Sequence, residues 1–310
     1  MALEAVRRAA RQSAKRVVER ALVVGGAAYV GRVVRRGGAA VLAYHNVVPD
    51  DAIPAGDRSL HLRRSDFIQQ LHHLRESFDV VALGELVHEP GRQSGKPRIA
   101  ITFDDAYHGA LTLGVEELRR LGLPATVFVA PDLLSDSAFW WDVVADPALG
   151  EVEPALRDRV LRELGGRGKE ILHGDGRPAS APLTRCHRPG TTADVVAALD
   201  RHPGLTLGAH SWSHPNLAAV SDAELERELQ LPLEWLARTT DRWLPVIAYP
   251  YGLTSPRVAE AAADRGYVAG WRATGGWMRT TSRWMLECPR VTIPAGVSSD
   301  GFRLLVAGLR

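Results

Sequence analysis

The chain has 310 residues, of which 45% are hydrophobic and 24% are charged. These fractions are typical of globular proteins, and they exclude collagen-like, low-complexity and largely disordered chains. The formal net charge of +2 gives no indication of a nucleic-acid partner. Only two cysteines occur, Cys186 and Cys288, and their wide separation excludes a disulfide framework and a cysteine-rich zinc site, although a single bridge stays possible.

The first 38 residues form a basic segment that differs from the rest. Residues 1–40 hold nine arginine or lysine side chains and two glutamates, a charge of +7, so the remainder carries −5. An apolar run at 21–31 is shorter than the about 20 residues that a membrane-spanning helix needs, and no small-residue cleavage site follows it. We therefore expect no transmembrane helix or cleavable signal peptide, and a protein that is cytoplasmic or peripheral to a membrane.

Two interpretations of residues 1–38 remain open. The charge and the apolar run favour a basic amphipathic leader that lies on an anionic membrane surface. The alternative is a solvated helical leader that packs on the folded domain.

Residues 39–310 form a single predicted domain in which strands and helices alternate. Short β-branched runs predict strands at 40–44, 80–83, 98–103, 125–129, 205–209, 246–249, 267–270 and 290–293. Helical periodicity and capping residues predict helices at 65–77, at 109–121, from 221 to about 236 and from 255 to about 266. This alternation predicts a parallel sheet, open or closed into a barrel, with the working residues at the carboxyl ends of the strands.

Residues 131–204, which lie between two predicted strands, interrupt this alternation of strands and helices. The segment is too long for a simple crossover connection. It contains a Phe-Trp-Trp-Asp-Val-Val stretch at 139–144 and a glycine-, proline- and arginine-rich part at 165–190. We interpret it as an insertion over the strand ends, where substrate-contacting loops are often found.

Asp104 and Asp105 follow the apolar strand predicted at 98–103. Two adjacent carboxylates at a strand end repel each other and lose hydration, unless a cation lies nearby. One of them could then bind a metal while the other transfers protons. The alternative is a helix N-cap followed by an exposed aspartate.

His210 and His214 follow the strand predicted at 205–209. Two histidines four positions apart can present both imidazoles to one metal ion. Together with Asp105 they would supply three ligands and leave positions open for water and substrate, which is the arrangement of a hydrolytic zinc site.

Two further strand ends carry candidate residues. The Pro-Tyr-Gly turn at 250–252 could direct a backbone N–H of Tyr251 toward a developing oxyanion, or it could be an ordinary proline turn. His45 ends the first predicted strand, where a capping or buried histidine is the simpler interpretation before its context is considered.

In this order, the sequences TFDD at 102–105, HSWSH at 210–214 and YPYG at 249–252 resemble the motifs of the NodB-type polysaccharide deacetylases, carbohydrate esterase family 4. The likeness covers about residues 40–295. It implies an irregular (β/α) barrel, with the long insertion at about 131–204, that removes N-acetyl groups from amino-sugar polymers by means of one divalent metal. Zinc is the expected ion, with cobalt, nickel or iron as alternatives.

The resemblance also implies roles for individual residues. Asp104 is the general base that activates a water on the metal. Asp105, His210 and His214 hold the metal, and the backbone N–H of Tyr251 helps to bind the oxyanion.

Two departures from the family pattern affect the proton transfers. Ala248 stands where many members have an arginine that orients the base, so Arg290 or Arg188 would have to supply that support. No histidine follows His214, although many members carry the general-acid histidine near the C-terminus. His45 lies in a Tyr-His-Asn-Val stretch that resembles the opening of the circularly permuted poly-N-acetylglucosamine deacetylases, and this context makes it the candidate acid, with His108 as the next choice.

The sequence therefore predicts a metal-dependent deacetylase of an N-acetylated glycan, without a nucleic-acid partner. Trp140 and Trp141 in the insertion and Trp212 in the histidine motif are candidate sugar contacts, although most tryptophans serve packing. The alternatives are a deacylase of a nucleotide-sugar or lipid-linked sugar, and a glycan-binding pseudoenzyme.

Overall fold

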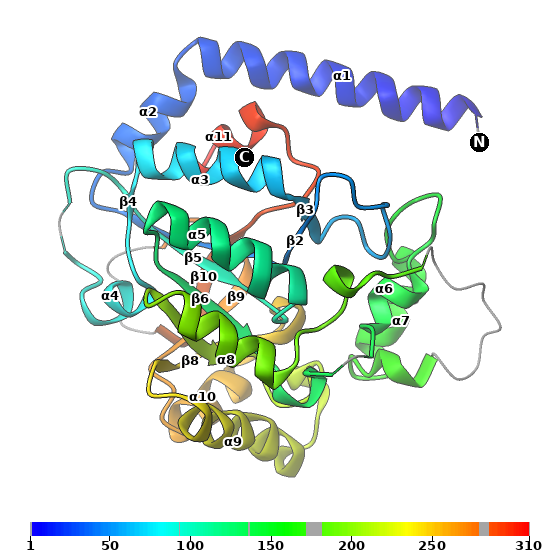
Figure 1. Cartoon of the computed structure of the whole chain (residues 1–310), viewed down its shortest axis with the longest axis vertical. Coiled ribbons are helices and arrows are strands. Elements are labelled where there is room, and N and C mark those ends of the chain that lie inside the picture. Colours follow the sequence, from blue (N-terminus) through cyan, green and yellow to red (C-terminus); the bar gives the residue numbers. More distant parts are fainter. Residues whose placement is uncertain (1, 93, 136, 172–181, 279–284, 310) are drawn as a thin grey trace.

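The computed structural model describes residues 2–92, 94–135, 137–171, 182–278 and 285–309. Its centre is a closed barrel of parallel strands (Figure 1). The barrel order is β1-β10-β9-β8-β7-β6-β5, the ring is closed by pairing of β1 with β5, and β4 pairs with β5 in addition. The bounds are β1 Ala39–Tyr44, β4 Asp79–Val80, β5 Arg98–Phe103, β6 Ala125–Val129, β7 Leu205–Ala209, β8 Trp243–Ala248, β9 Ala269–Gly275 and β10 Cys288–Thr292. The predicted irregular (β/α) barrel is thereby confirmed.

Helices surround this barrel, and a small parallel sheet of β2 Asn46–Val48 and β3 His61–Arg63 lies beside it. The α-helices after the first strand are α3 Arg64–Ser77, α4 Leu83–His88, α5 Val115–Leu121, α6 Trp140–Val144, α7 Pro154–Arg162, α8 Thr192–Arg201, α9 Asp222–Thr239, α10 Pro256–Asp264 and α11 Ser299–Val306. Shorter helical turns are the π-helical η1 Ala110–Gly114 and the 3₁₀ turns η2 Pro131–Leu133, η3 Gly168–Ile171, η4 Arg185–His187, η5 Leu217–Ala219, η6 Pro250–Gly252 and η7 Met285–Glu287.

Alternate residues of the strands face the barrel interior, because successive side chains of a strand point to opposite faces. Val41 of β1 and Ala100 of β5 belong to one small apolar cluster, whereas their neighbours along each strand join the larger core under the helices. His45 and Asp104 continue the same inward series just past the ends of β1 and β5. The sequence pattern of these two strands therefore places both side chains at the mouth of the barrel.

Most predicted elements agree with the structure, and three differ. The strand expected at 267–270 begins later and is longer, at β9 Ala269–Gly275. The strand expected at 80–83 is reduced to Asp79–Val80, because the chain turns into α4 at Leu83. The helix expected at 109–121 begins with the π-helical turn η1 before α5. Insertions of this kind are frequent beside functional sites, and η1 follows closely on the acid pair.

The long connection between β6 and β7 is present, as predicted for residues 131–204. It contains α6 and α7, while its last part, α8, is an ordinary barrel helix that packs on α5 and β7. Part of the predicted glycine-rich patch, residues 172–181, lies outside the described residues. Cys186 and Cys288 are both free thiols, so the bridge that the sequence left possible is absent.

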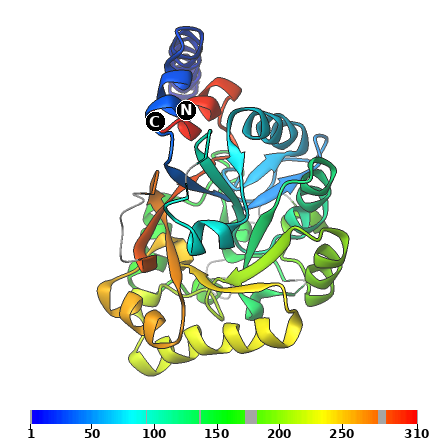
Figure 2. The same ribbon diagram turned by 90° about the vertical axis from the view of Figure 1, so that its left-hand side faces the viewer.

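The chain before β1 forms α1 Ala2–Val24 and α2 Ala27–Val34, which lie outside the ring of barrel helices beside α11 (Figures 1 and 2). Gly31 permits the close approach of α2 to α11, since a Cβ at this position would lie 2.7 Å from the carbonyl oxygen of Ala307. None of the described helices is long and apolar enough to span a bilayer.

Candidate active site

The ends of β1 and β5 bring His45 and Asp104 to neighbouring positions. Tyr44 pairs with Phe103 in the parallel register, and the Asp104 N–H donates to the Tyr44 carbonyl oxygen at 2.9 Å. Both His45 and Asp104 line a pocket at the carboxyl ends of the strands. Asp105, His210, His214 and Tyr251, which the motifs also single out, line the same pocket.

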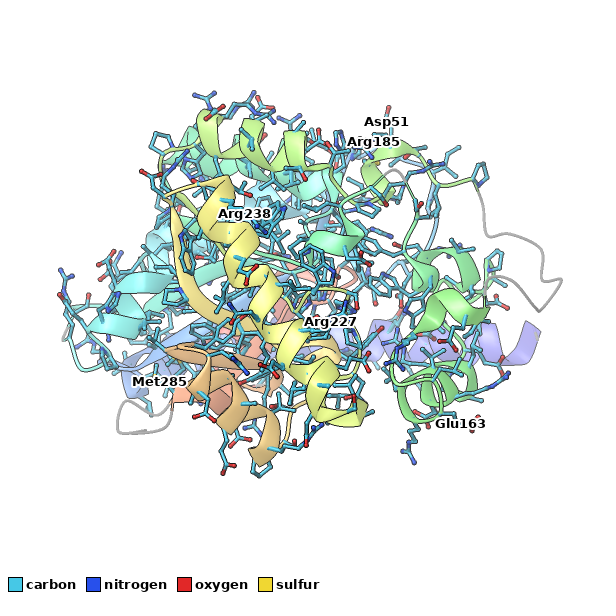
Figure 3. All side chains as sticks on the ribbon, turned by 90° about the horizontal axis from the view of Figure 1, so that it is seen from below. Asp51, Glu163, Arg185, Arg227, Arg238 and Met285 are labelled. Atoms are coloured by element: carbon cyan, nitrogen blue, oxygen red, sulfur yellow. The ribbon has the colours of Figure 1, made fainter. Side chains whose placement is uncertain are left out.

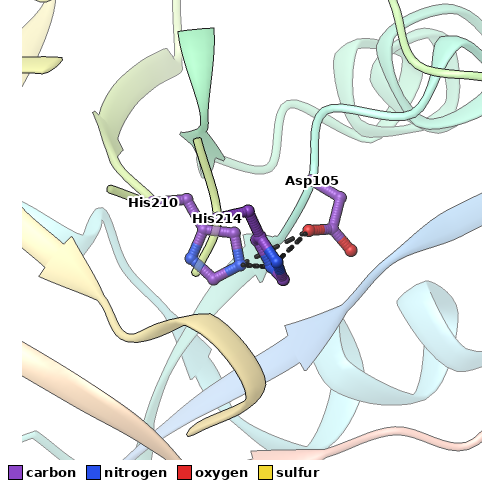
Figure 4. Close-up of side chains that lie close together, drawn as sticks. All are labelled: Asp105, His210 and His214. Carbon is purple, nitrogen blue, oxygen red and sulfur yellow. Dashed lines mark hydrogen bonds and ion pairs between the residues drawn. The ribbon is translucent and has the colours of Figure 1, made fainter. Parts of the chain in front are cut away.

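The side chains of Asp105, His210 and His214 converge (Figure 4). The Asp105 Oδ1 lies 3.4 Å from the His210 Nε2 and 3.2 Å from the His214 Nε2, and the two Nε2 atoms are 3.2 Å apart. All three side chains are buried. The His210 Nδ1 lies 2.6 Å from the Ala248 carbonyl oxygen and must donate to it, so in the neutral ring the Nε2 lone pair faces the other two ligand atoms.

Electrostatics in this cluster favour an anionic Asp105. Burial alone would raise the pKa of the Asp105 carboxyl, but the adjacent imidazoles of His210 and His214 outweigh it and hold the pKa well below the ordinary range. Burial lowers the pKa of His214, which favours the neutral imidazole that can bind a metal.

Among the described non-glycine residues, positive φ angles occur only within or directly beside the three sequence motifs. Five such residues have a positive φ: Asp105 (68°), Ala106 (51°), Ser211 (59°), His214 (64°) and Tyr251 (58°). Each left-handed conformation costs on the order of 1–3 kcal/mol and persists only where the surroundings hold it. The three motifs identified in the sequence are therefore the places where the fold stores backbone strain.

Arg290 of β10 holds the carboxylate of Asp104. The Arg290 Nη1 and Nη2 donate to the two carboxylate oxygens at 2.7 Å each, and Nε donates to the Arg272 carbonyl oxygen at 3.0 Å. Burial alone would raise the pKa of Asp104, but the charges of Arg290 and His210 lower it below its ordinary value. Arg290, one of the two arginines considered from the sequence as a support for Asp104, thus contacts its carboxylate directly.

Aromatic side chains close the pocket on the side of the insertion. Trp140 and Trp141 line it together with His214 and Tyr251, and the same four residues also line a neighbouring pocket, so they separate the two. The Trp140 Nε1–H donates to the Tyr251 hydroxyl at 3.2 Å, and that hydroxyl donates to the Gly166 carbonyl oxygen at 2.7 Å. The tryptophans are only 5% and 6% exposed, which leaves little ring surface open to a sugar.

Two other candidates lie away from this pocket. Neither Trp212 nor His108 belongs to its described lining. His108 lies 3.3 Å from Asp194, and its N–H donates to the carbonyl oxygen of Arg188, just before α8.

The sequence profile of the polysaccharide deacetylase family matches residues 91–270, more than half of the chain. The chain belongs to the polysaccharide deacetylase family. This membership makes it a hydrolase that deacetylates a glycan.

Solved structures of low sequence identity share its fold. The deacetylase PplD of Streptococcus pyogenes, solved in complex with acetate, is 17% identical over 86% of this chain and 96% of its own, with a TM-score of 0.60. The putative polysaccharide deacetylase BA0330 of Bacillus anthracis is 17% identical over 87% and 69% of the two chains, with a TM-score of 0.60. IcaB of Ammonifex degensii is 15% identical over 88% and 97%, with a TM-score of 0.57. No curated protein matches the chain.

A buried hydrogen-bond network, which the sequence did not predict, holds the insertion of this deacetylase against the barrel domain. The Trp141 Nε1–H donates to the Tyr107 hydroxyl at 2.7 Å, and this hydroxyl donates to the Asp142 Oδ2 at 2.7 Å. The Asp142 Oδ1 accepts from the Asp57 N–H at 2.9 Å and lies 3.0 Å from the His61 Nε2. Burial raises the pKa of Tyr107 well above its ordinary value, so the phenol stays protonated and can donate. No short-range pattern connects these residues, and the network could not be found from the sequence.

Glu228 of α9 was not predicted as a functional residue either, although its position in the sequence indicates that it has a buried partner. It lies between Leu225, Leu229 and Pro232 on the apolar face of the helix, and it is 5% exposed. A carboxylate within an apolar stripe indicates a buried partner, because an unpaired buried charge is costly. Its partners belong to the histidine motif, as described below.

Proposed function

We propose that this deacetylase removes N-acetyl groups from an amino-sugar-containing glycan with one divalent metal ion, held by Asp105, His210 and His214. The observation that carries the proposal is the convergence of these three ligand atoms beside the Asp104–Arg290 pair. Two neutral imidazoles and a carboxylate suit zinc first, with cobalt, nickel and iron as alternatives.

The residues present fit such an ion. The Asp105 Oδ1 is buried and has no hydrogen-bond partner among the described residues, a costly state that a cation would relieve. A divalent ion in this position would polarise the acyl carbonyl and lower the pKa of an attacking water. The remaining steps fall to the side chains of the pocket.

Asp104 acts as the general base. It accepts a proton from the attacking water while Arg290 keeps its carboxylate oriented, and the water oxygen forms a bond to the acyl carbon. The backbone N–H of Tyr251 donates to the oxyanion that develops on the former carbonyl oxygen. The left-handed conformation of Tyr251 is consistent with a backbone that is held for this purpose.

His45 is the proposed general acid. It donates a proton to the amide nitrogen as the carbon–nitrogen bond breaks, and acetate and a free amine leave. His45 lines the same pocket as Asp104, and among the residues described there it is the histidine that binds no metal in this proposal.

Substrate contacts are proposed for Trp140, Trp141 and Trp212. Because Trp140 and Trp141 are almost completely buried, we propose that they wall the pocket around the acylated substituent instead of stacking on a sugar ring. Trp212 lies outside the described lining of the pocket, so a contact there would involve a sugar farther along the glycan.

Acetate release from a panel of N-acetylated oligosaccharides tests the proposed function. The metal-free protein should be inactive, Zn²⁺, Co²⁺ or Ni²⁺ should restore release, and His214→Ala should lose metal content and activity together. Full metal content in His214→Ala would contradict the ligand set. Release from nucleotide-sugars or lipid-linked sugars alone would replace the polymer substrate with those compounds.

We further propose that the segment 1–38 attaches the enzyme to an anionic membrane surface. Fourteen large hydrophobic side chains of the described residues are exposed, and eight of them lie on α1 and α2: Val17, Val18, Leu22, Val24, Tyr29, Val30, Val33 and Val34. On α2 these residues lie opposite Ala28 and Gly31, which face α11. Exposed basic side chains of the same helices, such as Lys15 and Arg16, match the charge of an anionic bilayer, each contributing about 1 kcal/mol near the surface.

Co-sedimentation with lipid vesicles tests this attachment. The protein should sediment with vesicles that contain anionic lipid, and added salt should weaken the binding because it screens the basic residues. Replacement of Tyr29, Val30 and Val33 by serine should abolish sedimentation, whereas the matched change of exposed Val196 and Val268 should not. Sedimentation that is independent of both anionic lipid and salt, or a dimer held together by α2, would contradict the proposal.

A further inference from the structure

The two proposed histidine ligands, His210 and His214, lie at the ends of one loop, and the conformation of this loop depends on contacts with residues outside it. Between β7 and η5 the backbone turns through left-handed conformations at Ser211 and His214, with φ of 59° and 64°. Such conformations are unfavourable for residues with a Cβ, so the loop requires support from outside. Within it, the Ser211 hydroxyl accepts from the His214 N–H at 3.0 Å. This local bond leaves the N–H groups of the intervening residues to find other acceptors.

Glu228 supplies those acceptors. Its Oε2 accepts from the backbone N–H groups of Trp212 at 2.9 Å and Ser213 at 2.8 Å, and its Oε1 accepts from the Ser213 hydroxyl at 2.6 Å. Hydrogen bonds to an ionised carboxylate are stronger than those between neutral groups. One side chain thus binds the middle of the loop at three points, between the two ligand positions.

The position of Glu228 on α9 is unusual for an acidic residue. Arg227 and Arg238 extend from the exposed side of this helix (Figure 3), whereas Glu228 is 5% exposed on the buried side. α9 packs against β7, the strand that ends directly before His210. The helix therefore connects the loop to the same strand that positions the first ligand.

We propose that Glu228 is a positioning residue that holds the 210–214 loop in its metal-binding conformation. The inference rests on the proposed function, because it assumes that His210 and His214 bind a divalent ion. Glu228 is not part of the described lining of the pocket, and it acts through the backbone of Trp212 and Ser213. Its removal leaves two N–H groups without this acceptor and allows the loop to relax, so that the imidazoles separate.

The affinity for Zn²⁺ alone, measured on the metal-stripped full chain by competition with a chromophoric chelator, tests the proposal. Residues that orient metal ligands typically account for about 10–100-fold in metal affinity. We expect Glu228→Ala to weaken Zn²⁺ binding by this factor. Glu228→Gln should bind nearly as tightly as the wild type, because the amide oxygen accepts the two N–H bonds and the amide nitrogen can donate to the Ser213 hydroxyl.

Glu117→Ala is the matched control. Glu117 is 4% exposed on α5 and pairs with Arg64 away from the pocket, so its loss removes an equally buried carboxylate without touching the loop. This variant should unfold at a lower temperature with unchanged Zn²⁺ affinity. If Glu228→Ala binds Zn²⁺ like the wild type, or Glu117→Ala weakens binding as much, the positioning role is wrong. If the wild type binds no divalent ion, the proposed function fails together with this inference.

Should Glu228→Ala not fold, the remaining variants still decide the question. Ser213→Ala removes only the hydroxyl bond to Oε1 and keeps both N–H bonds, so it should weaken Zn²⁺ binding less than tenfold. Glu228→Leu keeps the buried volume but offers no acceptor, and it should weaken binding as Glu228→Ala does. Equal affinity of Glu228→Leu and Glu228→Gln would overturn the proposal.

Discussion

Asp104→Asn is expected to lower kcat by about 10²–10⁴-fold, the usual contribution of a general base, while the protein retains its metal. Asparagine cannot accept a proton from the attacking water, yet its oxygen can still receive one bond from Arg290. Asp104 lies beside the ligand cluster and not within it, so metal content should stay at the wild-type level. Metal analysis and acetate release, measured on the same preparation, check both statements.

The folding stability of this variant needs a separate measurement, because Asp104 and Arg290 are buried together at 4% and 1% exposure. Removing one partner of a buried ion pair typically costs about 3–5 kcal/mol. Thermal unfolding separates such a loss from a catalytic one. Asp194→Asn is a suitable comparison, since it changes a paired carboxylate outside the pocket and should leave kcat unchanged. A near wild-type rate in Asp104→Asn would show that another group is the base.

The strands could be predicted from the sequence because their residues are buried on both faces. Runs such as Ala125–Val129 read as continuous apolar segments, which is typical of parallel strands covered by helices. Because successive side chains of a strand point to opposite faces, the position of a residue in the strand then shows whether its side chain faces the barrel interior or the helices. His45 and Asp104 follow the inward-facing Val41 and Ala100 by an even number of positions, so their placement at the barrel mouth follows from counting alone.

The family motifs predicted which groups meet, but not what supports them. Arg290 was one of two candidates for orienting the base, and only the order of the strands decides between them: β10 lies beside β1, which in turn pairs with β5 and its Asp104. The Asp142 network joins residues from β3, the segment after β5, and α6. Such long-range hydrogen bonds depend on tertiary packing, for which a single sequence contains no local signal.

Helix α8, by contrast, could have been predicted from residues that are close together in the sequence. Thr191 and Asp194 form a capping box at the start of α8, and the buried Val195 and Leu199 are four positions apart. These residues are sufficient to predict α8 as a helix, although the glycine- and proline-rich segment before it favours an irregular insertion. The two strands of the small sheet, three residues each, are too short to be recognised by periodicity.

His45→Ala is expected to lower kcat by about 10²–10⁴-fold and to remove the basic limb of the pH–rate profile. Collapse of the tetrahedral intermediate expels an amine, which is a poor leaving group until it is protonated. A general acid must carry its proton at the start of this step, so activity falls as the pH rises and the acid loses it. An alanine at this position has no proton to lose, and the residual rate should not decline in that way.

The barrel places His45, which directly follows the first strand, at the same pocket as Asp104. In the closed barrel β1 lies between β10 and β5, so His45 lines the same pocket as Asp104, whose carboxylate Arg290 of β10 holds. His45→Ala should keep its metal and its unfolding temperature, because His45 belongs to neither the ligand cluster nor the buried core. His108→Ala provides the control: this side chain pairs with Asp194 outside the pocket, and its loss should leave the profile intact. If the basic limb persists in His45→Ala and disappears in His108→Ala, the proton comes from His108 and the pocket must rearrange to admit it.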